Sequence, residues 1–158
     1  MGYTHYWEKK DEIDEKEYSA ALKDIASIVR KQKEVKLSDG SGDQGKKPTL
    51  TGGISFNGLD EKSHESFVLP KTASSMEKFD FCKTAQKPYD IVVVAALARL
   101  AEVKGIEVSS DGRPDDWEDG VKLASTILGR KVQNPLNKKA LSLVKSSYME
   151  KIKKLSKP

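Results

Sequence analysis

The alternation of apolar and polar residues between positions 79 and 112 predicts the centre of the fold. Residues 79–84 place Phe79 and Phe81 on one face of a strand and Asp80 and Cys82 on the other. After a polar turn, the alanine-rich stretch IVVVAALARLAEVKG predicts a helix that is buried on nearly all sides. Residues 106–110 resemble a second strand. This order of strand, helix and strand predicts a parallel crossover whose helix covers the sheet.

The remaining periodic segments complete the predicted architecture. They are a strand at 3–8, an amphipathic helix at 14–33, a hairpin formed by 54–57 and 66–69, and an amphipathic helix from Asp115 to Gly129. Together the segments predict an α+β (mixed α/β) domain. We expect a single sheet of about five strands, with a buried crossover helix and two covering helices.

Charge separates the chain into a domain of residues 1–129 and a basic C-terminal extension of residues 130–158. Of 28 basic and 24 acidic residues, nine bases and one acid lie in the extension, which leaves 19 bases and 23 acids in the domain. The basic sequence pI of about 9.0 therefore comes from the extension, and nucleic acid is not an expected partner. Apolar residues in the extension recur at helical spacing, which predicts an amphipathic helix that packs on its own body or on a second copy. These residues are Leu141, Val144, Tyr148, Ile152 and Leu155.

Composition also limits the location and the chemistry. No apolar run is long enough to span a bilayer, and the N-terminal residues do not resemble a signal peptide, so we expect a cytoplasmic protein without a membrane partner. The lone Cys82 agrees with a reducing compartment. Two histidines and one cysteine show no metal-binding spacing, and no cofactor is predicted.

The strongest candidate site is the edge where the crossover strand meets its helix, because helix amides and loop side chains converge there in such folds. Lysines and amides suit a phosphate, hydroxyls and a carboxylate suit sugar hydroxyls, and aromatic rings can stack on a base. The predicted ligand-binding residues are His5, Trp7, Asn57, Lys83, Thr84, Lys87, Tyr89, Ser109, Ser110 and Asp111. An alternative stays open at Asp90, whose carboxylate could cap the helix itself and leave an ordinary polar connection.

Two other patterns are weaker candidates. Residues 40–47, GSGDQGKK, nearly match a phosphate-binding loop, but Lys47 replaces the metal-binding hydroxyl and Pro48 blocks a following helix. A flexible surface loop is therefore favoured. Cys82 could pair with His5 or His64 as nucleophile and base, whereas a cysteine within a strand is more typical of a small buried side chain.

Several phrases resemble an uncharacterised family of small proteins from bacteria and their phages. They are GYTHYW, ISFNG, FCKTAQKPYD, VSSDG and the pair Asp116-Trp117, and the resemblance spans roughly residues 2–129. No activity is known for that family, so no catalytic residue is carried over. The resemblance implies that these phrases mark one surface. A viral setting, in the host cytoplasm, favours proteins that capture or destroy nucleotide signals of host defence.

The sequence therefore predicts a small-molecule-binding protein for a phosphorylated or nucleotide-like ligand, which in a phage would sequester a host signal. One alternative is a hydrolase acting on such a ligand, with His5 as base and Asp90 or Asp111 assisting. Another is a protein-interaction module, including a homo-oligomer, that uses the C-terminal helix.

Overall fold

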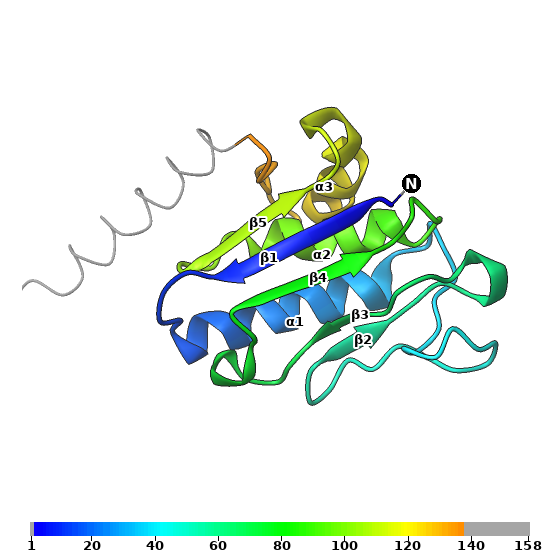
Figure 1. The fold of residues 1–158 in the computed structure, drawn as a ribbon, viewed down its shortest axis with the longest axis horizontal. Helices are drawn as coiled ribbons and strands as arrows, with labels where there is room; N and C mark the ends of the chain where they lie inside the picture. Colours follow the sequence, from blue (N-terminus) through cyan, green and yellow to red (C-terminus); the bar gives the residue numbers. More distant parts are fainter. Residues whose placement is uncertain (1, 138–158) are drawn as a thin grey trace, which may run out of the picture.

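The computed structural model describes residues 2–137 and confirms the α+β fold class (Figure 1). The elements are β1 (Thr4–Lys9), α1 (Glu15–Lys31), β2 (Ile54–Phe56), β3 (Phe67–Leu69), β4 (Phe79–Lys83), α2 (Asp90–Leu100), β5 (Ile106–Ser110) and α3 (Pro114–Leu128). Two short 3-10 turns, η1 (Asp60–Lys62) and η2 (Ala73–Ser75), flank β3. The predicted C-terminal helix lies outside the described residues.

The five strands form two sheets where the sequence pattern suggested one. The larger sheet has the order β4-β1-β5, and β1 runs antiparallel to both neighbours. The strands β4 and β5 are therefore parallel, and the predicted crossover exists, but it steps over β1. The strands β2 and β3 pair only as a hairpin, in the register Ile54↔Leu69 to Phe56↔Phe67. The hairpin's further pairings, Ser38↔Asn57 and Thr49↔Ser55, are isolated bridges, which are too short to extend either sheet.

The helices follow from apolar faces and local capping. At the start of α1, Asp14 Oδ1 accepts a hydrogen bond from Glu17 N at 3.0 Å, which satisfies one of the amides that a helix start leaves unpaired. Eight of the eleven residues of α2 are buried, in agreement with its prediction as the central helix. It ends at Leu100 instead of near Gly105, because residues 101–103 continue as tighter turns, with Val103 N donating to Leu100 O at 3.0 Å.

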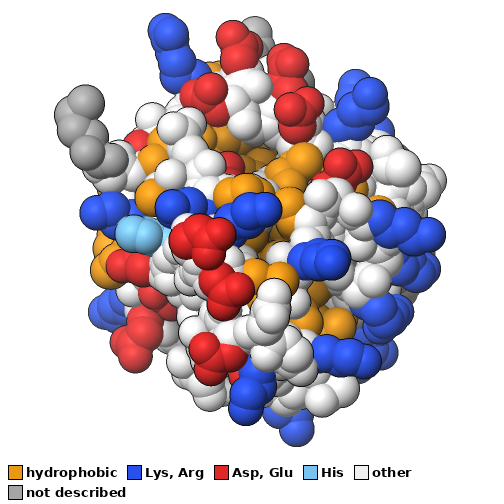
Figure 2. Space-filling view, turned by 90° about the vertical axis from the view of Figure 1, so that its right-hand side faces the viewer, with side chains coloured by type: hydrophobic (Ala, Val, Ile, Leu, Met, Phe, Trp, Pro, Cys, Tyr) orange, Lys and Arg blue, Asp and Glu red, His pale blue; other side chains and the backbone are white. Residues whose placement is uncertain are grey.

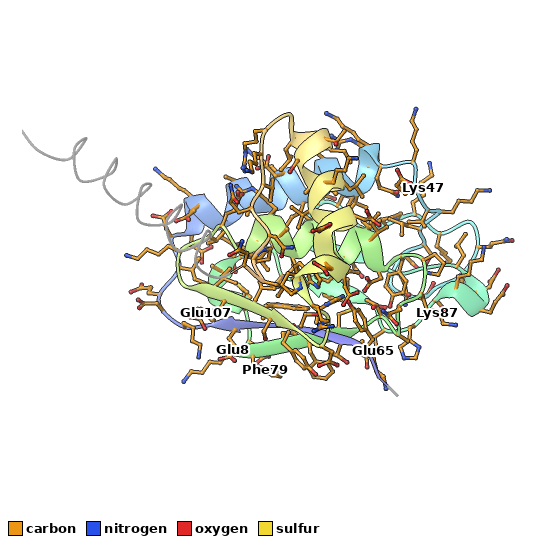
Figure 3. All side chains as sticks on the ribbon, turned by 90° about the horizontal axis from the view of Figure 1, so that it is seen from above. Glu8, Lys47, Glu65, Phe79, Lys87 and Glu107 are labelled. Atoms are coloured by element: carbon orange, nitrogen blue, oxygen red, sulfur yellow. The ribbon has the colours of Figure 1, made fainter. Side chains whose placement is uncertain are left out.

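All three described helices lie on one side of the three-stranded sheet, and no described element covers the opposite side, which we call the bare side (Figure 3). Figure 3 shows Glu8, Phe79 and Glu107 on that bare side. The helices α2 and α3 approach closely at Gly120, where a Cβ atom would lie 2.6 Å from Val94 Cβ and 3.0 Å from Ile91 O. Among residues 2–137, no helix combines the length and the apolar composition needed to cross a bilayer.

Candidate functional site

A hydrogen-bonded network centred on His5 connects the strands and the helix at the edge where β4 leads into α2. His5 Nε2 lies 2.6 Å from Asp90 Oδ1, and His5 Nδ1 lies 2.8 Å from Ser110 Oγ. Thr84 Oγ1 donates to the same Asp90 oxygen at 2.5 Å. The side chains of His5 and Thr84 come from β1 and from the residue after β4, and both residues are 0% exposed. The network therefore joins both outer strands of the sheet to the first turn of α2.

The neighbours of Ser110 and Asp90 limit the directions of these hydrogen bonds. Ser110 Oγ accepts from Gly112 N at 2.8 Å and from Trp117 Nε1 at 3.2 Å, so its own proton is available to His5 Nδ1 and to the neighbouring Tyr3 hydroxyl. The Asp90 carboxylate is an acceptor, so His5 Nε2 carries a ring proton and donates it to Asp90 Oδ1. The order serine, histidine, aspartate is that of a nucleophilic triad. In this arrangement both lone pairs of the hydroxyl are already used, and His5 has no exposed surface. The geometry is therefore that of a structural hydrogen-bond network, which connects the strands to α2, and not that of an accessible nucleophile.

The question that the sequence left open at Asp90 has a structural answer. Its Oδ1 accepts from two side chains, and the start of α2 at Tyr89 has no side-chain capping bond. Asp90 therefore does not cap its own helix. Its carboxylate is positioned by His5 and Thr84 at the wall of a cleft of about 300 Å³, between the turn of residues 86–90 and α3. We call this hollow the Asp90 cleft.

The Asp90 cleft carries the wrong charge for a phosphate. Asp90, Asp116 and Asp119 line it, against a single base, Lys87. Burial raises the pKa of the Tyr3 hydroxyl to about 12, and the negative charges of Asp90 and Asp116 add to that rise. A phosphate here would be repelled by the same carboxylates. The predicted edge is thus a real hollow, but its charge does not support the predicted ligand.

Several predicted site residues lie away from this cleft. Trp7 is 2% exposed and packs against Phe67, with ring centroids 5.4 Å apart. Tyr89 is 1% exposed, and its hydroxyl donates to Glu65 O at 2.5 Å. Both side chains belong to the hydrophobic core, so neither ring is exposed enough to stack on a ligand.

The other predicted residues hold loops or lie on the bare side of the sheet. Asn57 is buried and braces the turn after β2, with Nδ2 donating to His64 O at 2.9 Å and Oδ1 accepting from Gly58 N at 2.7 Å. Asp111 accepts from Tyr6 Oη and from Thr4 N, both at 3.1 Å. Lys83 and Ser109 are the register partners of Thr4 and Tyr6 on this side. The structure brings together only His5, Thr84, Lys87 and Ser110 around Asp90.

The weaker candidates have ordinary structural roles. Burial, followed by the negative charge of Glu65, raises the pKa of Cys82 to about 12, so its thiol is not an activated nucleophile. The loop of residues 40–47 leads to β2 instead of a helix, so it lacks the geometry of a phosphate-binding loop. Among residues 2–137 no group of three or more His, Cys, Asp or Glu side chains could hold a metal ion.

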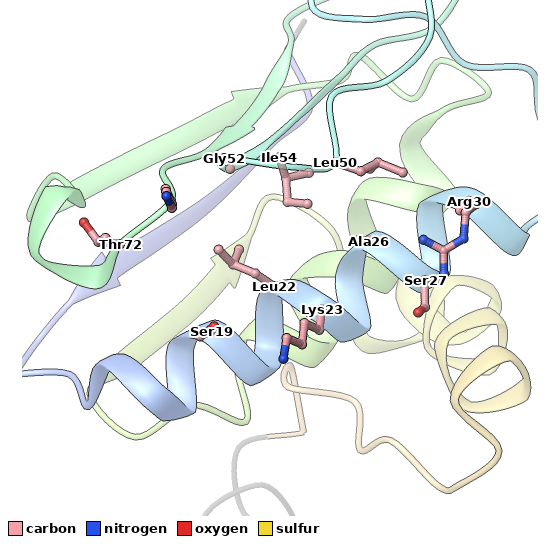
Figure 4. A pocket seen from close by; sticks show the side chains of 12 residues that line it. Ser19, Leu22, Lys23, Ala26, Ser27, Arg30, Leu50, Gly52, Ile54 and Thr72 are labelled. Carbon is pink, nitrogen blue, oxygen red and sulfur yellow. The ribbon is translucent and has the colours of Figure 1, made fainter.

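A second hollow has the charge that the Asp90 cleft lacks (Figure 4). This α1 groove, of about 520 Å³, runs between α1 and the segments 50–54 and 71–72. Three cationic side chains line it: Lys23 and Arg30 from α1, and Lys71 from the opposite wall. No acidic residue lines it, and none of the three cations forms an ion pair with any residue that the structure describes.

The α1 groove also has an apolar wall and hydroxyl groups. Leu22 from α1 and Ile54 from β2 point toward each other across it in Figure 4, and Ala26 and Leu50 extend this surface. The hydroxyls belong to Ser19, Ser27 and Thr72. Gly53, with φ of 111°, lets the loop pass β3, because a Cβ atom there would lie 2.7 Å from Leu69 O.

One wall of the α1 groove has a recognisable pattern in the sequence. Ser19, Lys23, Ser27 and Arg30 recur at intervals of four, four and three residues, which places them along one flank of a helix. The opposite wall had no such signal. Leu50 and Lys71 lie in loops, and no periodicity relates them to α1.

A third hollow, of about 580 Å³, lies between residues 34–36, the turn 58–62 and Pro88-Tyr89. It is lined by both signs of charge, including Glu34 and Asp60 as well as Lys36 and Lys62. Figure 2 shows hydrophobic side chains near the middle of this end of the molecule, with acidic and basic side chains around them. Because the charges are mixed, this hollow favours no particular class of ligand.

Comparison with known proteins adds no relative to this picture. No family model, curated protein or solved structure matches the chain, so the resemblance of residues 2–129 to bacterial and phage proteins stays a prediction.

Proposed function

We propose that this protein binds a phosphorylated small molecule in the α1 groove. The observation that carries the proposal is that Lys23, Arg30 and Lys71 line a hollow to which no described acidic residue contributes. Cations without ion-pair partners around a concave surface provide a site for an anion, and a guanidinium can hold two phosphate oxygens at once. The volume of about 520 Å³ lies in the range typical of small-molecule sites.

The dimensions of the groove suit a ligand that carries phosphate and an organic part. Lys23 and Arg30 are seven residues apart on α1, or roughly 10 Å along the helix axis. Lys71 belongs to the other wall, so both walls contribute positive charge to the groove. Leu22 and Ile54 offer an apolar surface for the rest of the ligand. A nucleotide would lie on these aliphatic side chains, since none of the described residues that line the groove is aromatic.

This proposal keeps the ligand class that the sequence predicted and changes its location. The Asp90 cleft is disfavoured for a phosphate by its three carboxylates. In a phage-encoded protein, tight binding in the α1 groove would sequester a host nucleotide signal.

The experiment is a thermal-shift screen of the full chain, followed by calorimetric titration of the compounds that raise the melting temperature. The panel contains phosphate, pyrophosphate, sugar phosphates, nucleoside monophosphates and cyclic dinucleotides, with the matching unphosphorylated compounds. We expect at least one phosphorylated compound to bind and its unphosphorylated counterpart to fail. Binding should weaken as salt is raised, because screening acts on exposed charges.

The matched variants are Arg30→Gln, Lys71→Gln and Lys16→Gln. Lys16 lies exposed on α1 outside the groove, so it controls for the loss of one charge. We expect each groove variant to lose roughly tenfold in affinity, about 1.4 kcal/mol, and the control to lose little. Equal losses in all three variants, or no binding of any phosphorylated compound, would overturn the proposal.

A further inference from the structure

The bare side of the three-stranded sheet, which we call the open face, carries three neighbouring aromatic rings. Tyr6 of β1 stacks on Phe79 of β4 with centroids 5.9 Å apart, and Phe79 lies 6.2 Å from Phe81. Phe79 and Phe81 are 50% and 49% exposed, and among the described residues Val68 is the only other large hydrophobic residue that is exposed. A contiguous apolar patch of this kind marks a surface that another segment or molecule covers.

Acidic side chains lie beside this patch, toward one edge of the sheet. Glu107 and Asp111 belong to β5 and the residue that follows it, and Glu8 lies between Phe79 and Glu107 in the register. Figure 3 shows Glu8, Phe79 and Glu107 together on the side away from the helices. Lys10 Nζ lies 3.0 Å from a carboxylate oxygen of Glu8 and 3.9 Å from one of Glu107, whereas β5 itself carries no base. A partner for this face therefore needs an apolar surface with positive charge at the β5 edge.

The described part of the chain ends close to that edge. Asn134 Nδ2 donates a hydrogen bond to the carbonyl oxygen of Pro114 at 2.8 Å, and Pro114 is the fourth residue after the end of β5. Leu136 packs against the hydrophobic core. β5 is an edge strand, and Figures 1 and 3 both show the last described residues beside it. The chain that continues from residue 138 thus starts next to the acidic edge of the open face.

The sequence after this point has the complementary chemistry. Residues 138–158 contain seven lysines and one acid. Five of their apolar residues, Leu141, Val144, Tyr148, Ile152 and Leu155, would share one face of a helix, whereas Leu143 would lie on the opposite face. A helix of 21 residues would be roughly 30 Å long, and strands of five or six residues span roughly 20 Å, so the segment is long enough to cross the face.

We propose that residues 138–158 cover the open face of their own chain, with the apolar stripe on Tyr6, Phe79 and Phe81. The lysines that flank the stripe face Glu107 and Asp111. Single-stranded nucleic acid also stacks on exposed aromatic rings, but the carboxylates of this face would repel its phosphates.

The test places a nitroxide on the full chain at Ser146→Cys, which lies opposite the stripe on the predicted helix. Cys82 is fully buried and stays unlabelled. In the two-dimensional NMR spectrum we expect the amide signals of β1, β4 and β5 to lose intensity to the spin label, while those of α1 keep theirs. If the amide signals of the sheet lose no more intensity than those of α1, the proposal is overturned.

Two controls keep the result specific. In the first, isotope-labelled chain without nitroxide is mixed with unlabelled chain that carries it, and the sheet signals should stay unaffected. Losses of signal intensity in this mixture would show that a second copy covers the face, against the proposal.

The second control is a pair of charge reversals in the spin-labelled chain. Glu107→Lys should restore part of the lost intensity, while Glu118→Lys, an exposed charge reversal on α3, should not. Equal effects of the two reversals would contradict the role of the acidic edge.

Discussion

Replacing Asp90 by alanine is expected to destabilise the fold strongly, because two buried donors lose their acceptor. The Nε2–H of His5 and the hydroxyl of Thr84 both donate to Asp90 Oδ1, and both residues are 0% exposed. A buried donor left without a partner costs about 1–3 kcal/mol. Water entering from the adjacent cleft offsets part of the two losses, so we expect a decrease of about 3 kcal/mol in the free energy of unfolding. That is a large share of the 5–15 kcal/mol that is typical of a domain.

Urea denaturation measures this loss through the shift in the unfolding midpoint, at unchanged dependence on urea concentration. Asp119→Ala is the matched control, since it removes an exposed carboxylate from the same cleft and should change stability by no more than about 0.5 kcal/mol. Asp90→Asn keeps an oxygen acceptor, so its loss in the free energy of unfolding should lie between those of Asp90→Ala and Asp119→Ala. A loss below about 1 kcal/mol for Asp90→Ala would refute the reasoning, because it would mean that His5 and Thr84 find other partners.

The other predictions concern packing and ionisation. Gly120→Ala should lower the free energy of unfolding by about 1–2 kcal/mol, since the clash with α2 outweighs the gain in helix propensity; unchanged or higher stability would contradict the close packing. Stability should fall as the pH rises from about 9 toward 12, because Tyr3 and Cys82 keep their protons in the folded state up to a pKa of about 12, whereas the unfolded chain loses them near the ordinary values of 10.0 and 9.0. A urea midpoint that stays constant over this range would oppose that account. Cys82 should react with an aromatic disulfide reagent far more slowly in the native protein than in urea, and equally fast reaction would show that the thiol is accessible.

Local periodicity was enough to predict most elements of the fold, since each pattern reports on its own segment. The alternation in residues 79–84 correctly predicted that Phe79 and Phe81 share one face of β4, and the apolar run after Asp90 correctly predicted the most buried helix. The pattern could not predict that β1 lies between β4 and β5, because alternation does not say which strand is the neighbour. It also could not separate the β2–β3 hairpin from the larger sheet.

The candidate site, like the fold, was predictable from the sequence only where the signal lies within one segment. His5, Asp90 and Ser110 are 85 and 105 residues apart in hydrogen-bonded pairs, so only the strand order brings them together. Trp7 and Tyr89 were predicted to stack on a ligand, yet the same aromatic character makes them core residues. The cations of the α1 groove gave a helical spacing signal for one wall only, and the charge of a hollow can be judged only when both walls are known.

The central claim is that the α1 groove binds a phosphorylated ligand. The most direct test is to follow the amide signals of the full chain by NMR during titration with the phosphorylated compound that gives the largest thermal shift. We predict saturable shifts concentrated at residues 19–30, 50–54 and 71–72, and their loss in Arg30→Gln but not in Lys16→Gln. Shifts concentrated instead at residues 86–90 and 116–120, around the Asp90 cleft, would contradict the claim.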